Sequence, residues 1–269
     1  VRQIANAHTL FNITNTFIQL PFAGLLVALV TKIIPGEEDG DETKLKFLDK
    51  RILETPSVAV VQIIKEILRM GDIARANVKM SVDGIIFNDE KLIAEVYAKE
   101  KVLNELEKRI TEYLLEVSNS PISAEQSSRV LSLFNTVHDV ERIGDHAENL
   151  VELAQFKIDN KIKFSDMATE ELREIYETVD NCLEKAFTAL KTDDKKFVKE
   201  ADMYERKVDM LRDKYRDSHI KRLNNRECQI NAGVIFLDIL TNLERVGDHG
   251  INIAEIVSPS SITLKPKKI

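Results

Sequence analysis

The chain has 269 residues, of which 31% are charged, and its formal net charge is −7. Nine glycines, six prolines and no tryptophan disfavour β-sandwiches and barrels and are typical of long helices rich in Glu, Lys and Leu. The acidic balance, with scattered Lys and Arg, argues against nucleic acid as the main partner. Cys182 and Cys228 lack metal-ligand spacing, so we expect reduced thiols in a cytosolic domain.

The first 35 residues are predicted to contain a membrane span. The chain opens at Val1 without the regions of a signal peptide, and we expect it to be the C-terminal part of a longer protein. Residues 17–34 are almost wholly apolar, and a helix of that length reaches about 27 Å, just enough for a bilayer core. A buried helix of a soluble domain is the alternative. A polar stripe at helical spacing precedes the span and suggests a face turned toward a pathway: His8, Asn12, Asn15, Thr16 and Gln19.

Residues 36–55 are predicted to be a linker that leaves the membrane. An acidic, glycine-containing run follows Pro35, which is typical of a loop. Four basic residues come next, which places this side in the cytoplasm by the positive-inside bias: Lys44, Lys46, Lys50 and Arg51.

Two short segments resemble bacterial sodium/phosphate cotransporters. QIANAHTLFN, from Gln3 to Asn12, is similar to their last membrane repeat, and LDKRILETP, from Leu48 to Pro56, is similar to the linker before their regulatory tail. The resemblance covers only about the first 56 residues. It implies phosphate as substrate, sodium as coupling ion, and the bacterial inner membrane as location.

Six helices are expected after this linker, followed by a disordered tail over residues 258–269. Thr55 and Pro56 form an N-cap and first-turn proline, and Ser123 with Gln126 resembles a capping box. Breaks at polar, Asn- or Pro-containing turns separate the helices. The expected helices cover about 56–85, 92–117, 123–157, 165–190, 195–222 and 226–257.

A repeat organises the helical part. The segments Val140–Glu152 and Leu243–Glu255 are near copies at a fixed offset of 103 residues, which indicates a duplicated unit. Each copy places a Glu and an Asp one helical turn apart, as Glu141 with Asp145 and Glu244 with Asp248. Like charges at this spacing destabilise a helix slightly, so their repetition suggests a cation. Carboxylate oxygens suit magnesium, calcium, manganese or iron better than zinc. A solvated acidic stripe paired with the adjacent arginines is the alternative.

The motif E-R-[IV]-G-D-H-x-x-N in both copies resembles the signature of PhoU domains, over roughly residues 56–257. This resemblance implies an all-α fold of two pseudo-symmetric three-helix bundles, covering residues 56–160 and 165–257, and metal clusters held by paired E(D)xxxD motifs on neighbouring helices. The implied second site is Glu205, Asp209, Glu244 and Asp248, and the implied first site is Glu100, Asn104, Glu141 and Asp145. Because Asn104 carries no charge, we expect iron, manganese or magnesium to fill the second site first.

Two further pairs of motif residues have expected roles. Gly144 and Gly247 each cost about 1 kcal/mol in a helix relative to Ala, which suggests close approach of a neighbouring backbone. His146 and His249 point about 100° away from the motif aspartates, so we expect them beside a site or on the surface and not as ligands.

The sequence shows no catalytic arrangement, and an enzyme is not expected; a di-iron enzyme would need Glu-x-x-His pairs that the signature positions lack. The favoured interpretation is the C-terminal end of a sodium/phosphate cotransporter with a cytoplasmic PhoU-like regulatory domain. The alternative is a free-standing, metal-binding PhoU-like adaptor in phosphate signalling. The helical domain is also a candidate surface for homo-oligomers.

Overall fold

The computed structural model describes residues 8–9, 11–12, 14–17, 42–226 and 228–257. The chain divides into two compact units, Val1–Glu42 and Thr43–Ile269. In the first unit residues 8–9, 11–12 and 14–17 are helical, and the Thr16 hydroxyl donates to the carbonyl of Asn12 at 2.9 Å. Apart from Phe17, the predicted apolar span at 17–34 lies outside the described residues, as does the predicted tail at 258–269. Within the described ranges, every helix is too short or too polar to cross a bilayer.

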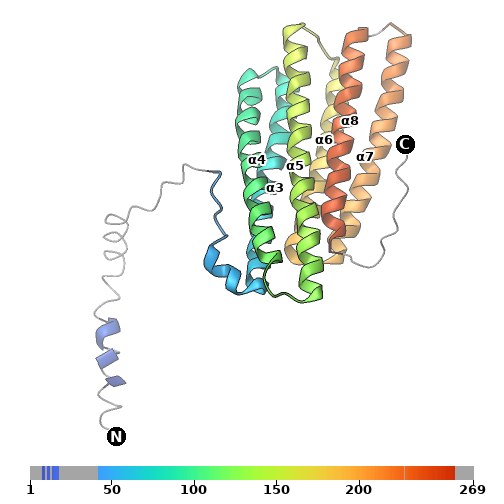
Figure 1. The fold of residues 1–269 in the computed structure, drawn as a ribbon. Coiled ribbons are helices and arrows are strands. Elements are labelled where there is room, and N and C mark those ends of the chain that lie inside the picture. The colour runs from blue at the N-terminus through green and yellow to red at the C-terminus, as the bar shows by residue number, and fades with distance from the viewer. Residues whose placement is uncertain (1–7, 10, 13, 18–41, 227, 258–269) are drawn as a thin grey trace. The chain divides into compact units, whose positions relative to one another are not determined.

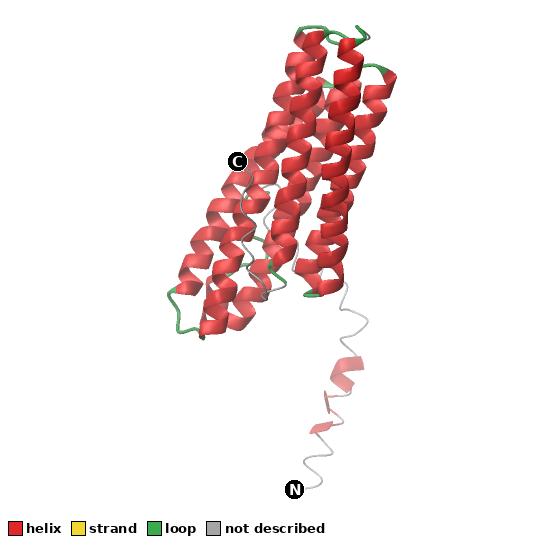
Figure 2. Ribbon diagram, turned by 90° about the vertical axis from the view of Figure 1, so that its right-hand side faces the viewer, coloured by secondary structure: helices red, strands yellow, loops and turns green. Residues whose placement is uncertain are grey.

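The second unit is built from six long α-helices arranged as two bundles (Figures 1 and 2), which confirms the predicted all-α class. Helices α3, α4 and α5 pack together, as do α6, α7 and α8, and the bundles join along α5 with α8 and α3 with α6. The bounds are α3 Pro56–Phe87, α4 Glu90–Ser118, α5 Ala124–Asp159, α6 Asp166–Thr192, α7 Lys195–Asn224 and α8 Ile230–Glu255.

Local side-chain chemistry sets most of these helix ends. Ser123 and Gln126 form the predicted capping box at the start of α5. Asn88 ends α3 in the left-handed conformation, at φ 55°, which asparagine tolerates better than most residues. Thr55 occupies the N-cap of α3 ahead of Pro56, but its side chain makes no capping hydrogen bond within the described structure. The proline alone therefore marks this start.

One continuous apolar core runs through both bundles. The predicted seam of α8 faces inward, with Phe236, Leu240 and Leu243 essentially fully buried, and Leu133 and Ile143 of α5 are buried in the same way. Burying each such side chain contributes about 1.5–3 kcal/mol. The two halves are thus held together by shared core, which fixes how their polar faces meet.

The second half of the predicted linker is part of this unit and not a free connection. The carboxylate of Glu66 on α3 is fully buried and accepts the backbone N–H groups of Lys46 and Phe47 at 2.9 and 2.8 Å. Arg69 pairs with Glu66 and donates to the carbonyl of Lys44 at 2.9 Å. Apolar side chains of this strap, defined as residues 43–55, and of its short helix η2 (Lys50–Glu54) pack on the core: Leu45, Leu48, Ile52 and Leu53.

We expect Glu66→Gln to release the strap. An amide keeps the shape but puts an N–H group against the donors that the carboxylate binds, and losing such charge-assisted hydrogen bonds costs about 2–3 kcal/mol. Trypsin should then cleave after Lys44 and Lys46 several-fold faster, and the unfolding midpoint should fall. The matched control is Glu95→Gln, at an exposed position on α4. Equal cleavage rates in both variants would contradict the role of Glu66 in holding the strap.

Candidate metal centres

The first candidate centre lies where α4 faces α5 and contains a buried carboxyl group with no partner. Glu100 of α4 is 3% exposed, and neither of its side-chain oxygens finds a hydrogen bond within the described residues. Burial, with the nearby charges of Asp145, Glu148 and Glu141, raises the pKa of Glu100 to about 8. A carboxyl group in this setting is largely protonated at neutral pH unless a cation neutralises it.

Gly144 of α5 gives Glu100 the room to lie there. A Cβ at Gly144 would stand 2.6 Å from Oε2 of Glu100 and 2.8 Å from Cδ1 of Leu103. The predicted close approach therefore exists in the first half, although side chains of α4 make it and not a backbone. At Gly247 a Cβ would meet Val208 at an ordinary 3.6 Å, so the second glycine is not required by space.

The other first-half residues are less tightly placed. Glu141 is half-buried, and its pKa is raised by burial and then by Asp145. Arg142 lies 3.8 Å from Glu141 and donates to Asp145 at 3.0 Å. Asn104, the predicted fourth member, is exposed on α4. The structure thus places Glu100 near Glu141 and Asp145, while Asn104 is exposed to solvent.

The second candidate centre, between α7 and α8, already contains a cation of the chain itself. Nη1 of Arg212 donates to Oε1 of Glu244 at 3.2 Å, and its guanidinium lies 3.9 Å from Asp209. Arg245 is 3.7 Å from both Glu244 and Asp248. Burial raises the pKa of Glu244, while the two arginines oppose that rise. The fourth predicted member, Glu205, is half-buried on α7.

The difference between the centres comes from positions outside the motifs. Glu100 and Glu205 are 105 residues apart, and so are Leu103 and Val208, which approach the two motif glycines. By the same offset, Glu107 of the first half corresponds to Arg212 of the second, so the charge at this position is reversed. Glu107 contributes to the raised pKa of Glu141.

A second exchange of this kind distinguishes the signature helices. At the offset of 103, Glu148 on α5 corresponds to Ile251 on α8, and Glu148 contributes to the raised pKa of Glu100. The offsets were readable from the sequence, but counting only motif positions missed both exchanges. The first centre therefore contains negative charges that a comparison based on Asn104 alone leaves out, and which centre binds metal first stays a prediction.

The residues of the first centre fit a hard cation in composition but are not preassembled around one. No three Asp, Glu, His or Cys side chains within the described part of the chain are arranged to hold one metal ion. The two unpartnered oxygens of Glu100 nevertheless supply the donor type and surplus negative charge that such an ion needs.

The motif histidines join the two halves. His146 Nδ1 lies 2.9 Å from Oδ1 of Asn242, and His249 Nδ1 lies 2.8 Å from Oδ1 of Asp139. Asp139 and Asn242 are themselves 103 residues apart, so the contact is reciprocal under the repeat. The two rings lie 5.6 Å apart, and burial lowers the pKa of His146. Each ring therefore uses its Nδ1 in a contact with the other half of the unit, and the expectation that neither histidine is a metal ligand stays a prediction.

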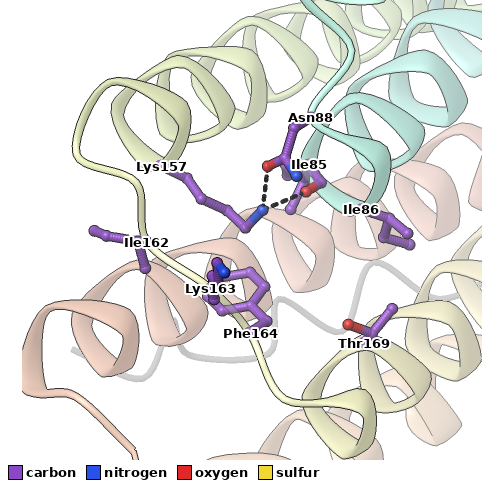
Figure 3. Close-up of a pocket in the computed structure, with 8 residues that line it drawn as sticks. All are labelled: Ile85, Ile86, Asn88, Lys157, Ile162, Lys163, Phe164 and Thr169. Carbon is purple, nitrogen blue, oxygen red and sulfur yellow. Dashed lines mark hydrogen bonds between the residues drawn. The ribbon is translucent and has the colours of Figure 1, made fainter.

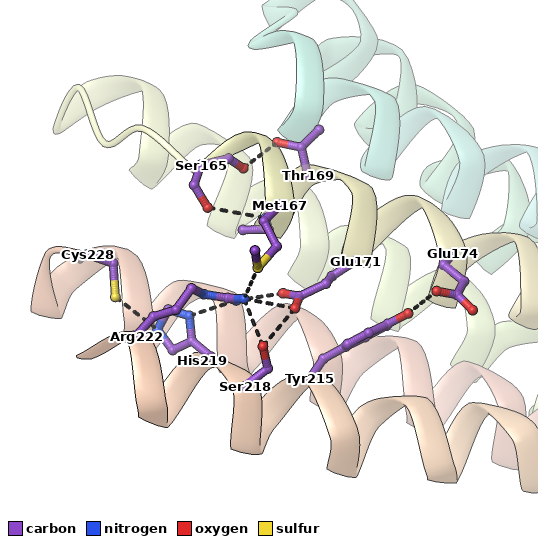
Figure 4. Close-up of polar contacts among 11 residues, drawn as sticks. Ser165, Met167, Thr169, Glu171, Glu174, Tyr215, Ser218, His219, Arg222 and Cys228 are labelled. Atoms are coloured by element: carbon purple, nitrogen blue, oxygen red, sulfur yellow. Dashed lines mark hydrogen bonds and ion pairs between the residues drawn. The ribbon is translucent and has the colours of Figure 1, made fainter. Parts of the chain in front are cut away.

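A second polar cluster lies between the start of α6 and the end of α7, and its opposite charges are paired within the chain (Figure 4). Arg222 of α7 pairs with both carboxylate oxygens of Glu171 on α6, at 2.8 and 2.5 Å, and donates to the hydroxyl of Ser218 at 3.0 Å. His219 stacks on the ring of Phe236 at 5.0 Å. Because its charges match, this cluster ties α6 to α7 and is not a candidate for an external ion.

These features define a class: an all-α protein made of a duplicated three-helix unit that carries an acidic face in each half. The model of the PhoU domain family matches residues 67–154 and 172–257, which is more than half of the chain. The chain belongs to the PhoU domain family, as the signature motif predicts.

Relatives and solved structures agree with this assignment. YjbB of Salmonella typhimurium, named for inorganic phosphate export, is 24% identical over 250 residues, 92% of this chain and 46% of that protein. The chain thus spans about half the length of the YjbB proteins it matches. A PhoU homologue of Thermotoga maritima, named as an accessory protein of phosphate-specific transport, is 25% identical over 66% of this chain and 76% of its own. The crystal structure of PhoU from Pseudomonas aeruginosa matches with a TM-score of 0.69 at 24% identity, over 75% of this chain and 96% of that one, and shows the same fold.

The raised pKa of Glu100 predicts how stability depends on pH in the presence of a chelator. Because the folded-state pKa of about 8 lies above the ordinary 4.5, the contribution of Glu100 to stability is largest below pH 4.5 and is lost as pH rises from 4.5 through 8. Glu100→Gln removes this loss. The variant should match the wild type near pH 5 and be more stable at pH 9 by a few kcal/mol. Denaturant unfolding at both pH values measures it. With Glu95→Gln as control, parallel pH profiles for all three proteins would contradict the assignment.

Proposed function

We propose that this chain is a metal-binding regulatory module of phosphate homeostasis, acting on phosphate transport. Family membership supports the phosphate-linked role, and the names of the PhoU relatives associate them with phosphate-specific transport. The single observation that carries the metal-binding part is the buried, unpartnered carboxyl group of Glu100 between α4 and α5.

In the first centre, Glu100 and Asp145 are the principal ligands and Glu141 and Glu148 add negative charge. Magnesium, manganese or iron bound there would supply the positive charge that Glu100 lacks. Since Glu100 is largely protonated at neutral pH without metal, binding releases its proton. The affinity should therefore rise with pH until about 8, the pKa of this group. Binding would also tie α4 to α5 and so change the rigidity of one bundle.

In this proposal the second centre binds metal more weakly than the first, because an ion must first displace Arg212. That guanidinium donates to Glu244 at 3.2 Å and lies near Asp209. An arginine cannot lose its charge in a protein, so it competes with any cation at every accessible pH.

Metal titration of the chelator-treated protein tests this order. Asp145→Asn should lower the affinity of the tighter manganese site about tenfold or more, which corresponds to ~1.4 kcal/mol, whereas Asp248→Asn should leave that site unchanged. Arg212→Gln should strengthen the weaker site. Asp217→Asn, at an exposed position of α7, controls for charge alone. Equal effects of Asp145→Asn and Asp248→Asn, or no bound metal in any preparation, would support the solvated acidic stripe instead.

A second candidate function has its own observation. The unit Thr43–Ile269 contains 227 of the 269 residues, about 84%, whereas the YjbB match covers 92% of the chain. The match must therefore reach into the first 42 residues. It supports the proposal that the chain is the C-terminal part of a phosphate transporter in the bacterial inner membrane, with the PhoU unit on the cytoplasmic side.

Two details of the transporter proposal, the coupling ion and the direction of transport, depend on a single resemblance or a single name. Sodium coupling rests on the resemblance of residues 3–12 to sodium/phosphate cotransporters. The direction of transport expected from that resemblance is inward, while the YjbB name states export. Ion and phosphate fluxes in vesicles containing the whole protein would decide both details.

Fractionation separates the two candidates. If residues 17–34 span the bilayer, the full chain should sediment with membranes and need detergent, while a variant beginning at Thr43 should stay in the supernatant. The compactness of the unit from Thr43 onward makes this a fair comparison. Recovery of the full chain as a monomer in detergent-free buffer would favour the free-standing regulator.

A further inference from the structure

A cavity of about 230 Å³ lies where the two halves of the helical unit are connected (Figure 3). The C-terminal end of α3, the C-terminal end of α5 and the start of α6 meet around it. Ile85, Asn88, Lys157, Lys163, Phe164 and Thr169 are among its lining residues. Its lining residues include none of the carboxylates of the two candidate metal centres.

The cavity is lined by a buried ammonium group whose charge is not matched. Lys157 is 4% exposed, and its Nζ donates to the carbonyl of Ile85 at 2.9 Å and to Oδ1 of Asn88 at 2.5 Å. The ring of Phe164 lies 5.2 Å away. All three partners are neutral, and no carboxylate within the described residues pairs with Lys157. An ammonium group has three N–H donors, so one is left over.

Part of this arrangement is explained by the helix end alone. Ile85 and Asn88 belong to the C-terminal turn and cap of α3, and a cation there interacts favourably with roughly half a negative charge on the helix terminus. That partial charge leaves about half of the lysine charge unmatched in a buried setting. The cost appears as a lowered pKa of Lys157, caused by burial.

A second ammonium lines the same cavity. Lys163, in the connection between α5 and α6, is exposed and makes no hydrogen bond or ion pair within the described part of the chain. The hydroxyl of Thr169 donates to the carbonyl of Ser165 at 3.2 Å, so its oxygen can still accept a hydrogen bond. Two lysines thus share one cavity without an acidic side chain among its lining residues, although the chain has a net charge of −7.

We propose that this cavity is a binding site for a small oxyanion of the inorganic phosphate class, held between Lys157 and Lys163. The remaining N–H of Lys157 and the ammonium of Lys163 donate to it, and the oxygen of Thr169 accepts from a protonated anion. The volume suits a tetrahedral oxyanion with a few waters, each of about 30 Å³. It lies below the roughly 300–1,000 Å³ of sites for drug-sized ligands, which argues against a nucleotide.

Binding at this place would join three elements of both halves. The anion would add charge-assisted contacts between the end of α5 and the segment that leads into α6, beside the C-terminal cap of α3. The proposal does not depend on metal binding, because it uses none of the carboxylates of the first or second centre.

Isothermal titration of the chelator-treated full chain with inorganic phosphate, at constant ionic strength and in detergent if membrane-bound, tests the site. Lys163→Met should weaken binding at least tenfold without altering the fold, because Lys163 caps no helix. Lys157→Met should abolish binding and also lower the unfolding midpoint. Lys199→Met, at an exposed position of α7, should leave binding unchanged.

The controls separate the outcomes. Asp145→Asn should bind phosphate like the wild type, which distinguishes this site from phosphate carried on a bound metal. Absence of saturable phosphate binding by the wild type would overturn the proposal. Equal affinities for the wild type and the Lys163→Met variant would do the same, since Lys157 would then serve only as the cap of α3. Neither result bears on the metal titration above.

Discussion

The antiparallel contact between α5 and α8 is the constraint on which the rest of the helical unit depends. Along this contact the residue numbers increase on α5 while those of their partners decrease on α8: Asp139 meets His249, and His146 meets Asn242. The apolar faces of both signature helices are thereby committed to the shared core. The acidic face of α5 lies against α4, and the acidic face of α8 lies against α7. Each half therefore has its own cluster of negative charge.

The two halves solve this electrostatic problem differently, although they derive from one repeated unit. The second half places Arg212 among its carboxylates and so carries its own counter-charge. The first half has Glu107 at the corresponding position and buries Glu100 beside Gly144. Burying an unpaired carboxyl group is unfavourable unless it is neutralised by a proton or a cation. The repeat keeps the helices and their packing, while differences one turn away from the motif give the halves different charge environments.

Much of the fold could be predicted because its signals are local or repeated. Capping residues such as Ser123 mark helix starts, and the 103-residue offset gives the duplication. Two features needed tertiary information. The strap is held by Glu66, twenty residues along the chain from Lys46, and no periodicity in the sequence reveals which buried carboxylate accepts its N–H groups. The role of Arg212 depends on the register of α7 against α8, which follows a different offset from that of the motif.

The histidine contacts at the central seam distinguish the halves from one another. One crossing pairs histidine with a carboxylate and the other pairs it with an amide, so two copies of the same half would reproduce only one kind of pair. The two crossings therefore differ in charge, because only one of them contains a carboxylate. Two chains that exchanged their second halves would rebuild both pairs unchanged. The contacts of the seam are thus the same whether the two halves belong to one chain or to two.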